Sequence, residues 1–351
     1  MAAARAEAIA GPDPKVRDRT NAMLRFALGV TGAFVLSEAM GWYPSFLGAI
    51  LAAVLLVSLP GPLSFKAGLV LILVQLLAAT GAYALTSLLL GVPIVLFGAI
   101  ALILFLSFSV MVQGRAVFPL LLLLIAISTI PVVTMVTPEH AGALPKAFVR
   151  GMAVAVVSLW VVHALWPQIV KGAGPPASAP IASPMRHALI GTAIVMPIML
   201  VYLMFGLTDA LPVLITTVVL VVNFDPKRGY AQGMAMMFGN FIGGIIALLS
   251  YAFLQISPSL LTLTLIVLLV AFFFAGWLAR AGSGAPVVLV TSNQAIILLS
   301  LALMPGPSNS GIWATRLLQF GIACAFAVAM MTLFLPRTQK VPAVGETAGT
   351  E

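Results

Sequence analysis

The chain has 351 residues, of which 62% are hydrophobic and 7% are charged, and its formal net charge at pH 7 is +8. A soluble domain carries roughly a quarter charged residues, so this composition excludes a soluble globular protein and requires lipid as the main solvent. The positive charge does not indicate nucleic-acid binding, because no basic run with interleaved aromatic residues is present. The single cysteine, Cys324, excludes an internal disulfide and a cysteine-based metal site.

Long apolar segments follow one another along the chain in two matching series. A helix needs about 20 apolar residues to cross the hydrocarbon layer. The first series predicts helices near 24–41, 45–59, 66–89, 93–112, 117–137 and 146–166. The second series predicts helices near 187–206, 210–223, 229–255, 259–280, 285–304 and 313–335. The second helix of each series is short, so each series holds six spans, or five if the short helix does not cross.

The two series open and close alike, which predicts an internal repeat. One opens with RFALGVTGA at Arg25 and the other with RHALIGTAI at Arg186, and both close with an apolar segment that ends in proline. The first 22 residues are polar and basic, and no small-residue cleavage site follows them, so the first apolar segment is expected to be a membrane helix and not a signal peptide. The predicted organisation is a cytoplasmic N-terminal arm (1–22), a first membrane repeat (23–168), a cytoplasmic linker (169–185), a second membrane repeat (186–337) and a cytoplasmic tail (338–351).

Basic residues concentrate at alternate junctions between the predicted helices. The N-terminal arm, the linker and every second junction carry Lys or Arg, whereas the junctions between them carry almost none, with Lys146 as the exception. The positive-inside rule therefore places both termini and the linker on the cytoplasmic side. An even number of spans per repeat makes the two repeats parallel, related by a pseudo-twofold axis along the membrane normal. The predicted fold class is an all-α polytopic membrane protein built from two parallel-oriented repeats.

Charged residues inside apolar segments are costly and are the first candidates for function. Glu38 lies in the C-terminal half of the first helix, where it is either a proton-titrating carboxylate in a cavity or an interfacial acid. Arg150 and Arg316 lie near the start of the last helix of each repeat. A guanidinium there either binds a carboxylate or phosphate bidentately, as an anion-contacting group or as the partner of an acidic residue, or is an arginine that reaches out to the membrane interface.

Polar side chains in the middle of other helices are candidates for lining a pathway. Gln75 and Asn240 occupy matching positions in the third helix of each repeat. Asn293 and Gln294 belong to the polar run TSNQ, and Ser128 lies in its first-repeat counterpart, before Pro131, a residue that can break the helix. The alternative for these residues is interhelical hydrogen bonding of about 1 kcal/mol each.

Several features favour ordinary structural roles over chemistry. Gly239 and Gly243 form a small-xxx-small face typical of close helix packing, and His163 is expected to be a hydrogen-bonded interfacial histidine. Asp225, Lys227 and Arg228 are expected to form a solvated cytoplasmic turn. No GxxxxGK[ST], HExxH, CxxC or GxSxG motif occurs, so we expect no enzyme activity, no cofactor and no metal.

These segments resemble the membrane module of the fusaric acid resistance and aromatic acid exporter superfamily. The resemblance rests on RFALGVTGAFVLSEAMGW, on LVSLPGPLSFKAG after a short helix, on KAFVRGMAVAV at the last helix, and on VVNFDPKRGYAQGMAMMFGNFIGGIIALL in the second repeat. The chain has only short tails where larger exporters carry a cytoplasmic domain, so it is similar to a compact inner-membrane relative. The resemblance implies an efflux permease of the Gram-negative inner membrane, with aromatic or other organic acids as substrates and a periplasmic membrane-fusion adaptor protein as partner.

The leading hypothesis is an inner-membrane permease that exports small organic anions, driven by an ion gradient. Glu38 would exchange the proton, Arg150 and Arg316 would attract the anion, and the polar helix residues would flank its route. One alternative is a passive channel, which shares the route but does not need Glu38. Another is a structural membrane subunit that anchors an adaptor, in which the polar residues only hold helices together. The oligomeric state stays open.

Overall fold

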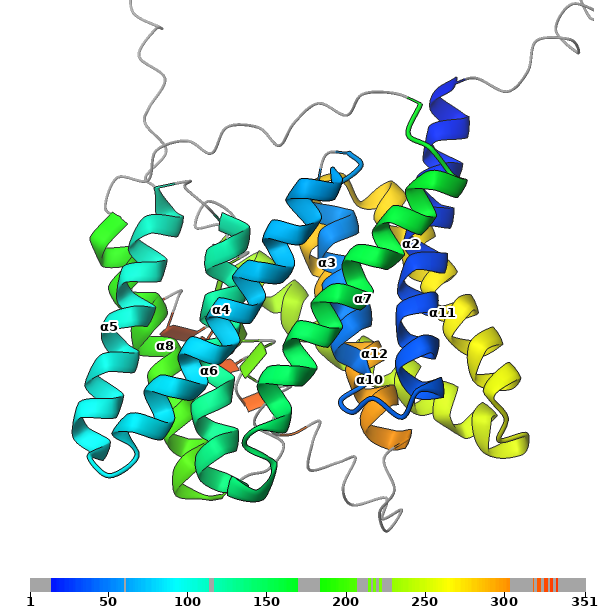
Figure 1. Ribbon diagram of the computed structural model, residues 1–351. Coiled ribbons are helices and arrows are strands. Elements are labelled where there is room, and N and C mark those ends of the chain that lie inside the picture. The colour runs from blue at the N-terminus through cyan, green and yellow to red at the C-terminus, as the bar shows by residue number, and fades with distance from the viewer. Residues whose placement is uncertain are drawn as a thin grey trace, which may run out of the picture.

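The computed structural model describes residues 14–59, 61–113, 117–169, 184–206 and 229–303, with a few further positions between 214 and 222 and between 318 and 333. Within these ranges every regular element is helical and no strand occurs. Nine of the described helices are long and apolar enough to cross a membrane. These features confirm the prediction of an all-α polytopic membrane protein (Figure 1).

The described helices follow the predicted apolar segments closely. The first half contains α2 (Pro14–Ala39), α3 (Phe46–Ser58), α4 (Phe65–Leu89), α5 (Pro93–Val112), α6 (Val117–Val136), the short 3-10 helix η1 (Pro138–His140) and α7 (Ala143–Leu165). The second half contains α8 (Pro184–Met204), α10 (Gly229–Ile256), α11 (Leu260–Ala281), η2 (Gly282–Gly284) and α12 (Ala285–Leu303). The first helix begins ten residues before the predicted start, because the polar residues after Pro14 continue the helix beyond the apolar stretch that hydropathy detects.

Helix starts coincide with the predicted breaks because serine side chains cap them. The hydroxyl of Ser64 accepts a hydrogen bond from the Ala67 amide at 3.2 Å, and the hydroxyl of Ser259 accepts one from the Thr262 amide at 3.1 Å. Each bond satisfies a backbone N–H that the first helical turn leaves unpaired. The two serines thus fix the starts of α4 and α11 just after the proline-bearing turns.

The second helix of the first half, α3, is short and enclosed by protein. It has 13 residues, or about 20 Å of rise, which is less than the hydrocarbon thickness of about 30 Å. All of its residues from Phe46 to Leu55 are buried, and it packs against α2, α7 and α12. The approach to α7 is close, since a Cβ atom added at Gly151 would lie 3.3 Å from the amide nitrogen of Gly48. The glycine that follows Arg150 therefore serves helix packing.

The two halves meet through their first and fourth helices. Helix α5 packs against α8, and α11 packs against α2, so the first helix of each half lies against the fourth helix of the other (Figure 1). A Cβ atom added at Gly191 would lie 3.1 Å from the Phe108 ring, and one added at Gly276 would lie 3.5 Å from Cε of Met23. Helices α6 and α12 are the most deeply enclosed of the long apolar helices, and both lie inside the bundle.

Corresponding helices of the two halves bury corresponding positions. The buried residues of α5 that recur 167 positions later in α11 are Leu96 with Leu263, Ile100 with Val267, Leu104 with Ala271, Ser107 with Phe274, and Phe108 with Ala275. The buried residues of α4 that recur 165 positions later in α10 are Gln75 with Asn240, Ala78 with Gly243, Ala79 with Gly244, and Ala82 with Ala247. The third and fourth helices of each half therefore turn the same faces toward the protein.

The start of α2 and the end of α7 lie at the same end of the bundle. The Asn21 side-chain amide donates to the carbonyl oxygen of Pro167 at 3.0 Å, and the Ile169 backbone amide donates to Oδ1 of Asp18 at 2.9 Å. A chain that returns to its starting end after α7 has passed through the bundle an even number of times. The first half thus has the parity that the charge pattern predicts.

Candidate functional site

The residues predicted to line a pathway are all enclosed by protein in this conformation. They are Gln75 on α4, Ser128 on α6, Asn240 on α10, and Asn293 and Gln294 on α12, each at most 6% exposed. None of them faces lipid. Polar groups in the interior of a membrane protein need hydrogen-bond partners. The hydrogen bonds of these side chains therefore show whether they bond to neighbouring helices or have donors and acceptors left for water or a ligand.

Gln75 and Gln294 have no hydrogen-bond partner among the described residues. Both the oxygen and the nitrogen of each side-chain amide are buried and unbonded, although each residue is only 1% exposed. Oδ1 of Asn293 and the hydroxyl of Ser292 are also buried and without a hydrogen-bond partner among the described residues. An unsatisfied buried polar group costs about 1–3 kcal/mol. These unbonded atoms therefore form no interhelical hydrogen bonds in the conformation described.

Ser128 differs from the amides because its own helix satisfies it. Its hydroxyl donates to the Ile125 carbonyl at 3.1 Å, and the Thr129 hydroxyl donates to the same carbonyl at 2.6 Å. Helix α6 runs on through Pro131, so the helix is not broken there as the proline pattern allowed. Proline lacks a backbone N–H, so one hydrogen bond of the α6 ladder is missing at this point.

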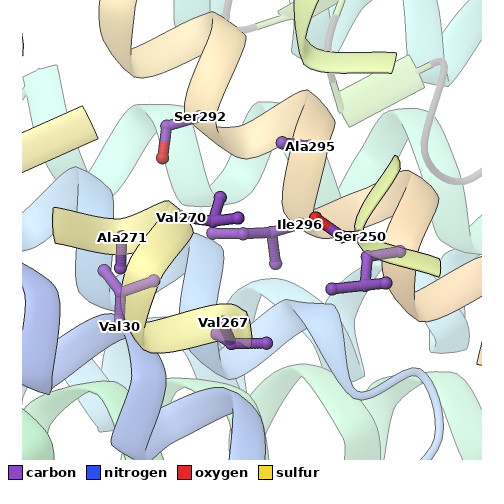
Figure 2. A pocket seen from close by; sticks show the side chains of 9 residues that line it. Val30, Ser250, Val267, Val270, Ala271, Ser292, Ala295 and Ile296 are labelled. Carbon is purple, nitrogen blue, oxygen red and sulfur yellow. The ribbon is translucent and has the colours of Figure 1, made fainter. Parts of the chain in front are cut away.

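A small cavity lies beside the polar run of α12, between α2, α10, α11 and α12 (Figure 2). Its volume is about 10 Å³, roughly the space of one water molecule. The hydroxyls of Ser250 and Ser292 are its polar groups, set among side chains such as Val267 and Ile296. Ser250 already donates to the Ile246 carbonyl at 2.7 Å, so Ser292 is the hydroxyl that needs a partner.

Glu38 is half-buried near the end of α2 and is linked to the central helix α12. The Ser45 hydroxyl donates a short hydrogen bond to Oε1 of Glu38, and the hydroxyls of Ser45 and Ser300 lie 2.6 Å apart. Ser45 and Ser300 are buried. A carboxylate at the bundle end is thus connected through two hydroxyls to the helix that carries Asn293 and Gln294. The sequence contained no signal for this link, because Ser45 and Ser300 lie 255 residues apart.

Arg150 holds the turn that follows α2. One of its Nη2 hydrogens is donated to the Tyr43 carbonyl at 3.1 Å, and its guanidinium carbon lies 4.9 Å from the centroid of the Trp42 ring. Within the described residues no ion pair joins Arg150 to Glu38. A guanidinium has five N–H donors, so further donors remain for an anion while these contacts position the group.

The remaining candidate residues either make ordinary structural contacts or lie outside the described residues. Nδ1 of His163 donates to the Leu159 carbonyl at 2.9 Å, which is the ordinary hydrogen-bonded role expected for it. Arg316 lies outside the described residues, as does the turn with Asp225, Lys227 and Arg228. In the described part of the chain, no group of three or more His, Cys, Asp or Glu side chains is placed to hold a metal ion.

The fold and these buried polar groups define a polytopic α-helical membrane protein whose architecture is consistent with a transporter-like role. Residues 22–162 match the family model described as "Protein of unknown function (DUF2955)". The match begins in α2 and ends within α7, so it covers the first membrane half, including Glu38, Gln75, Ser128 and Arg150. No curated protein and no solved structure matches the chain. The similarity to the fusaric acid resistance superfamily is therefore not confirmed by these comparisons.

Proposed function

We propose that this protein is an inner-membrane permease that exports small organic anions, aromatic acids among them, and is driven by an ion gradient. Two like-oriented membrane halves would form its route, with the central helices α6 and α12 between them. The observation that carries the proposal is the set of enclosed amides on α4 and α12 that find no partner in the described protein.

The pattern of helix packing supports two halves related by a twofold axis. A twofold axis makes the first helix of each half pack against the fourth helix of the other. The contacts of α5 with α8 and of α11 with α2 have this pattern. The recurring buried faces of α4 and α10, and of α5 and α11, have the same explanation. Parallel repeats of this kind place a substrate site at the interface between the halves, near the bilayer midplane.

Unpartnered amides favour a permease over a structural subunit. A subunit that only anchors other proteins gains nothing from a buried Gln75 or Gln294 that makes no interhelical bond, because each costs about 1–3 kcal/mol. A permease recovers that cost when water or substrate reaches the amides in another conformation. The enclosed state then corresponds to a closed step of alternating access.

Within this proposal the charged residues have separate tasks. Glu38 exchanges a proton with the outer side, and Ser45 and Ser300 transmit its change of charge to α12 through their hydrogen bonds. Arg150, positioned by Trp42 and the Tyr43 carbonyl, attracts the anion at the same end. Arg316 is proposed to do the same in the second half.

The placement in the cell is also part of the proposal. The Lys and Arg distribution supports a cytoplasmic location for both termini and for the linker. The protein would then release its substrate on the periplasmic side, where a membrane-fusion adaptor protein would receive it. In this orientation the start of α2 would lie on the cytoplasmic side and Glu38 near the periplasmic side.

Uptake of radiolabelled benzoate into inside-out proteoliposomes tests the proposal. An imposed proton gradient should drive uptake by the natural protein, and the double substitution Gln75→Leu with Gln294→Leu should lower it about tenfold, because one amide hydrogen bond to an anion is worth about 1.5 kcal/mol or more. The leucines also remove unsatisfied polar atoms, so the melting temperature should not fall. Absence of gradient-driven uptake by the natural protein would favour the structural subunit and contradict the proposal, whereas unchanged uptake in the double variant would remove the two amides from the route.

The same vesicles distinguish the permease from a passive channel. Collapse of the proton gradient with an uncoupler should abolish benzoate accumulation by a coupled permease. A channel would equilibrate benzoate at the same initial rate with or without the gradient. That second result would retain the route through the protein but remove Glu38 from the mechanism.

A further inference from the structure

A polar cavity lies at the end of the bundle where α2 begins and where α3 and α7 end. Its volume is about 70 Å³, and Arg25, Gly61, His163 and Gln168 are among the residues that line it. One water molecule occupies about 10–15 Å³ of such space, so the cavity has room for several waters or for one small polar group. On α2, Arg25 lies near the middle of the helix, about 20 Å before Glu38.

Arg25 brings a buried positive charge to this cavity without a bonded counterion among the described residues. The side chain is only 8% exposed, and its Nη1 donates to the Trp166 carbonyl at 2.9 Å. Asp18, two turns earlier on α2, acts on Arg25 through its charge, but its Oδ1 accepts from the Ile169 amide and forms no ion pair with the guanidinium. A buried charge without a bonded counterion costs several kcal/mol, so this arrangement favours an anion.

His163 and Gln168 are the other polar side chains at the cavity, and apolar residues of α2 and of the end of α3 complete its wall. His163, whose Nδ1 donates to the Leu159 carbonyl, has Nε2 left for another contact. Gly61 faces Gln168, since a Cβ atom added at Gly61 would lie 3.1 Å from its Oε1. Any side chain at position 61 would take up part of the space between them.

We propose that this cavity binds the carboxylate group of a small organic anion, with Arg25 as the principal contact. A guanidinium pairs with the planar carboxylate through two parallel hydrogen bonds. The cavity admits a carboxylate but leaves an attached ring outside. A lipid phosphate, which carries two substituents, fits a guanidinium that is 8% exposed less well. The choice of an organic anion rests on the proposed permease, whereas the binding itself needs no transport.

Isothermal titration of the purified full-length protein in detergent micelles with sodium benzoate tests the site. The natural protein should bind benzoate saturably and should not bind benzyl alcohol, which has the same ring without the charge. Arg25→Gln should weaken benzoate binding about tenfold or more, because a hydrogen bond to a charged group is worth about 1.5–3 kcal/mol. The matched control is Arg186→Gln, because Arg186 starts the equivalent segment of the second half but is exposed; its benzoate affinity should not change.

A second variant guards against misfolding, because Arg25→Gln also removes the hydrogen bond to Trp166. Gly61→Ala leaves Arg25 intact and adds one methyl group toward the end of the Gln168 side chain, which can move aside. It should weaken benzoate binding several-fold without lowering the melting temperature. Benzoate affinities that are equal in the natural protein and in both variants would overturn the proposal, as would equal binding of benzyl alcohol.

Lipid analysis and flux separate the remaining outcomes. If phosphatidylglycerol copurifies with the natural protein and is lost in Arg25→Gln while benzoate affinity stays the same, the cavity is a lipid-phosphate site and the proposal fails. If benzoate binds through Arg25 but the natural protein does not transport benzoate across the vesicle membrane, the proposed permease function is wrong and the proposed binding site is retained. If the natural protein transports benzoate and Arg25→Gln binds benzoate as tightly as the natural protein does, only the proposed binding site is wrong.

Discussion

At the scale of single residues, buried polar side chains in this protein are of two kinds. The hydroxyls of Thr86, Thr129 and Thr192 each donate to the carbonyl four residues earlier in their own helix, so they cost little inside the bundle. The amides of Gln75 and Gln294 have no such local partner. This contrast is the reason why the proposed function assigns the two amides to a route.

The role of Glu38 can be tested by neutralising its charge. Glu38→Gln should abolish proton-driven accumulation of benzoate in inside-out vesicles but preserve benzoate exchange between equal concentrations on both sides, because exchange does not require net proton movement. Glu139→Gln is the matched control, since Glu139 is an exposed acid in η1 at the far end of α6. Loss of both activities in Glu38→Gln with an unchanged fold would show that Glu38 is needed for the route itself and not for coupling.

Sequence reasoning found part of the candidate site at this scale. Gln75, Asn240, Asn293 and Gln294 stand out as polar residues in apolar helices, and all four are buried. Whether a buried amide is bonded depends on its neighbours in space, which no local pattern reveals. Arg25 shows the same limit, because its cavity forms only when the ends of α3 and α7 pack against the middle of α2.

At the scale of helices, small residues determine which pairs approach closely. Gly239 and Gly243 lie on the face of α10 that contacts α12, where an added Cβ at Gly239 would collide with the Thr291 hydroxyl. The small-xxx-small spacing predicts this packing from sequence alone. The pattern did not name the partner helix, since α12 is brought to α10 by the arrangement of the whole bundle. The contact places Gln294 directly against α10.

Two glycine substitutions test this helix contact with opposite expected signs. Gly243→Ala should lower the free energy of unfolding by about 1–3 kcal/mol, because the new Cβ would lie 2.5 Å from the Thr291 carbonyl oxygen. Gly81→Ala on α4 meets nothing within 4 Å and should raise it by about 0.5–1 kcal/mol, because alanine has less conformational entropy to lose than glycine. Thermal unfolding in detergent, followed by circular dichroism, measures both. Equal stability of the two variants would contradict a close α10–α12 contact.

At the scale of the whole molecule, hydropathy predicted the long described helices well, because each of them is long and apolar enough to span the same hydrocarbon layer. The predicted start of the first helix at residue 24 was wrong, because α2 begins at Pro14 and includes polar residues that hydropathy does not detect. The packing of α5 on α8 and of α11 on α2 joins segments far apart in sequence, so no local pattern predicts it. The proposed account depends on these contacts, because in it they bring two proposed like-oriented halves around one proposed route.

Labelling of single cysteines from each side of the membrane tests that orientation most directly, in a Cys324→Ser background. Arg19 and Arg186 lie within the first two turns of the first helix of each half, and Gly91 and Ser257 lie in the equivalent turns between the third and fourth helices. With cysteine at each position in turn, an impermeant maleimide should label 19 and 186 from the cytoplasmic side only, and 91 and 257 from the periplasmic side only. Labelling of 91 and 257 from opposite sides would mean inverted halves and would contradict the account.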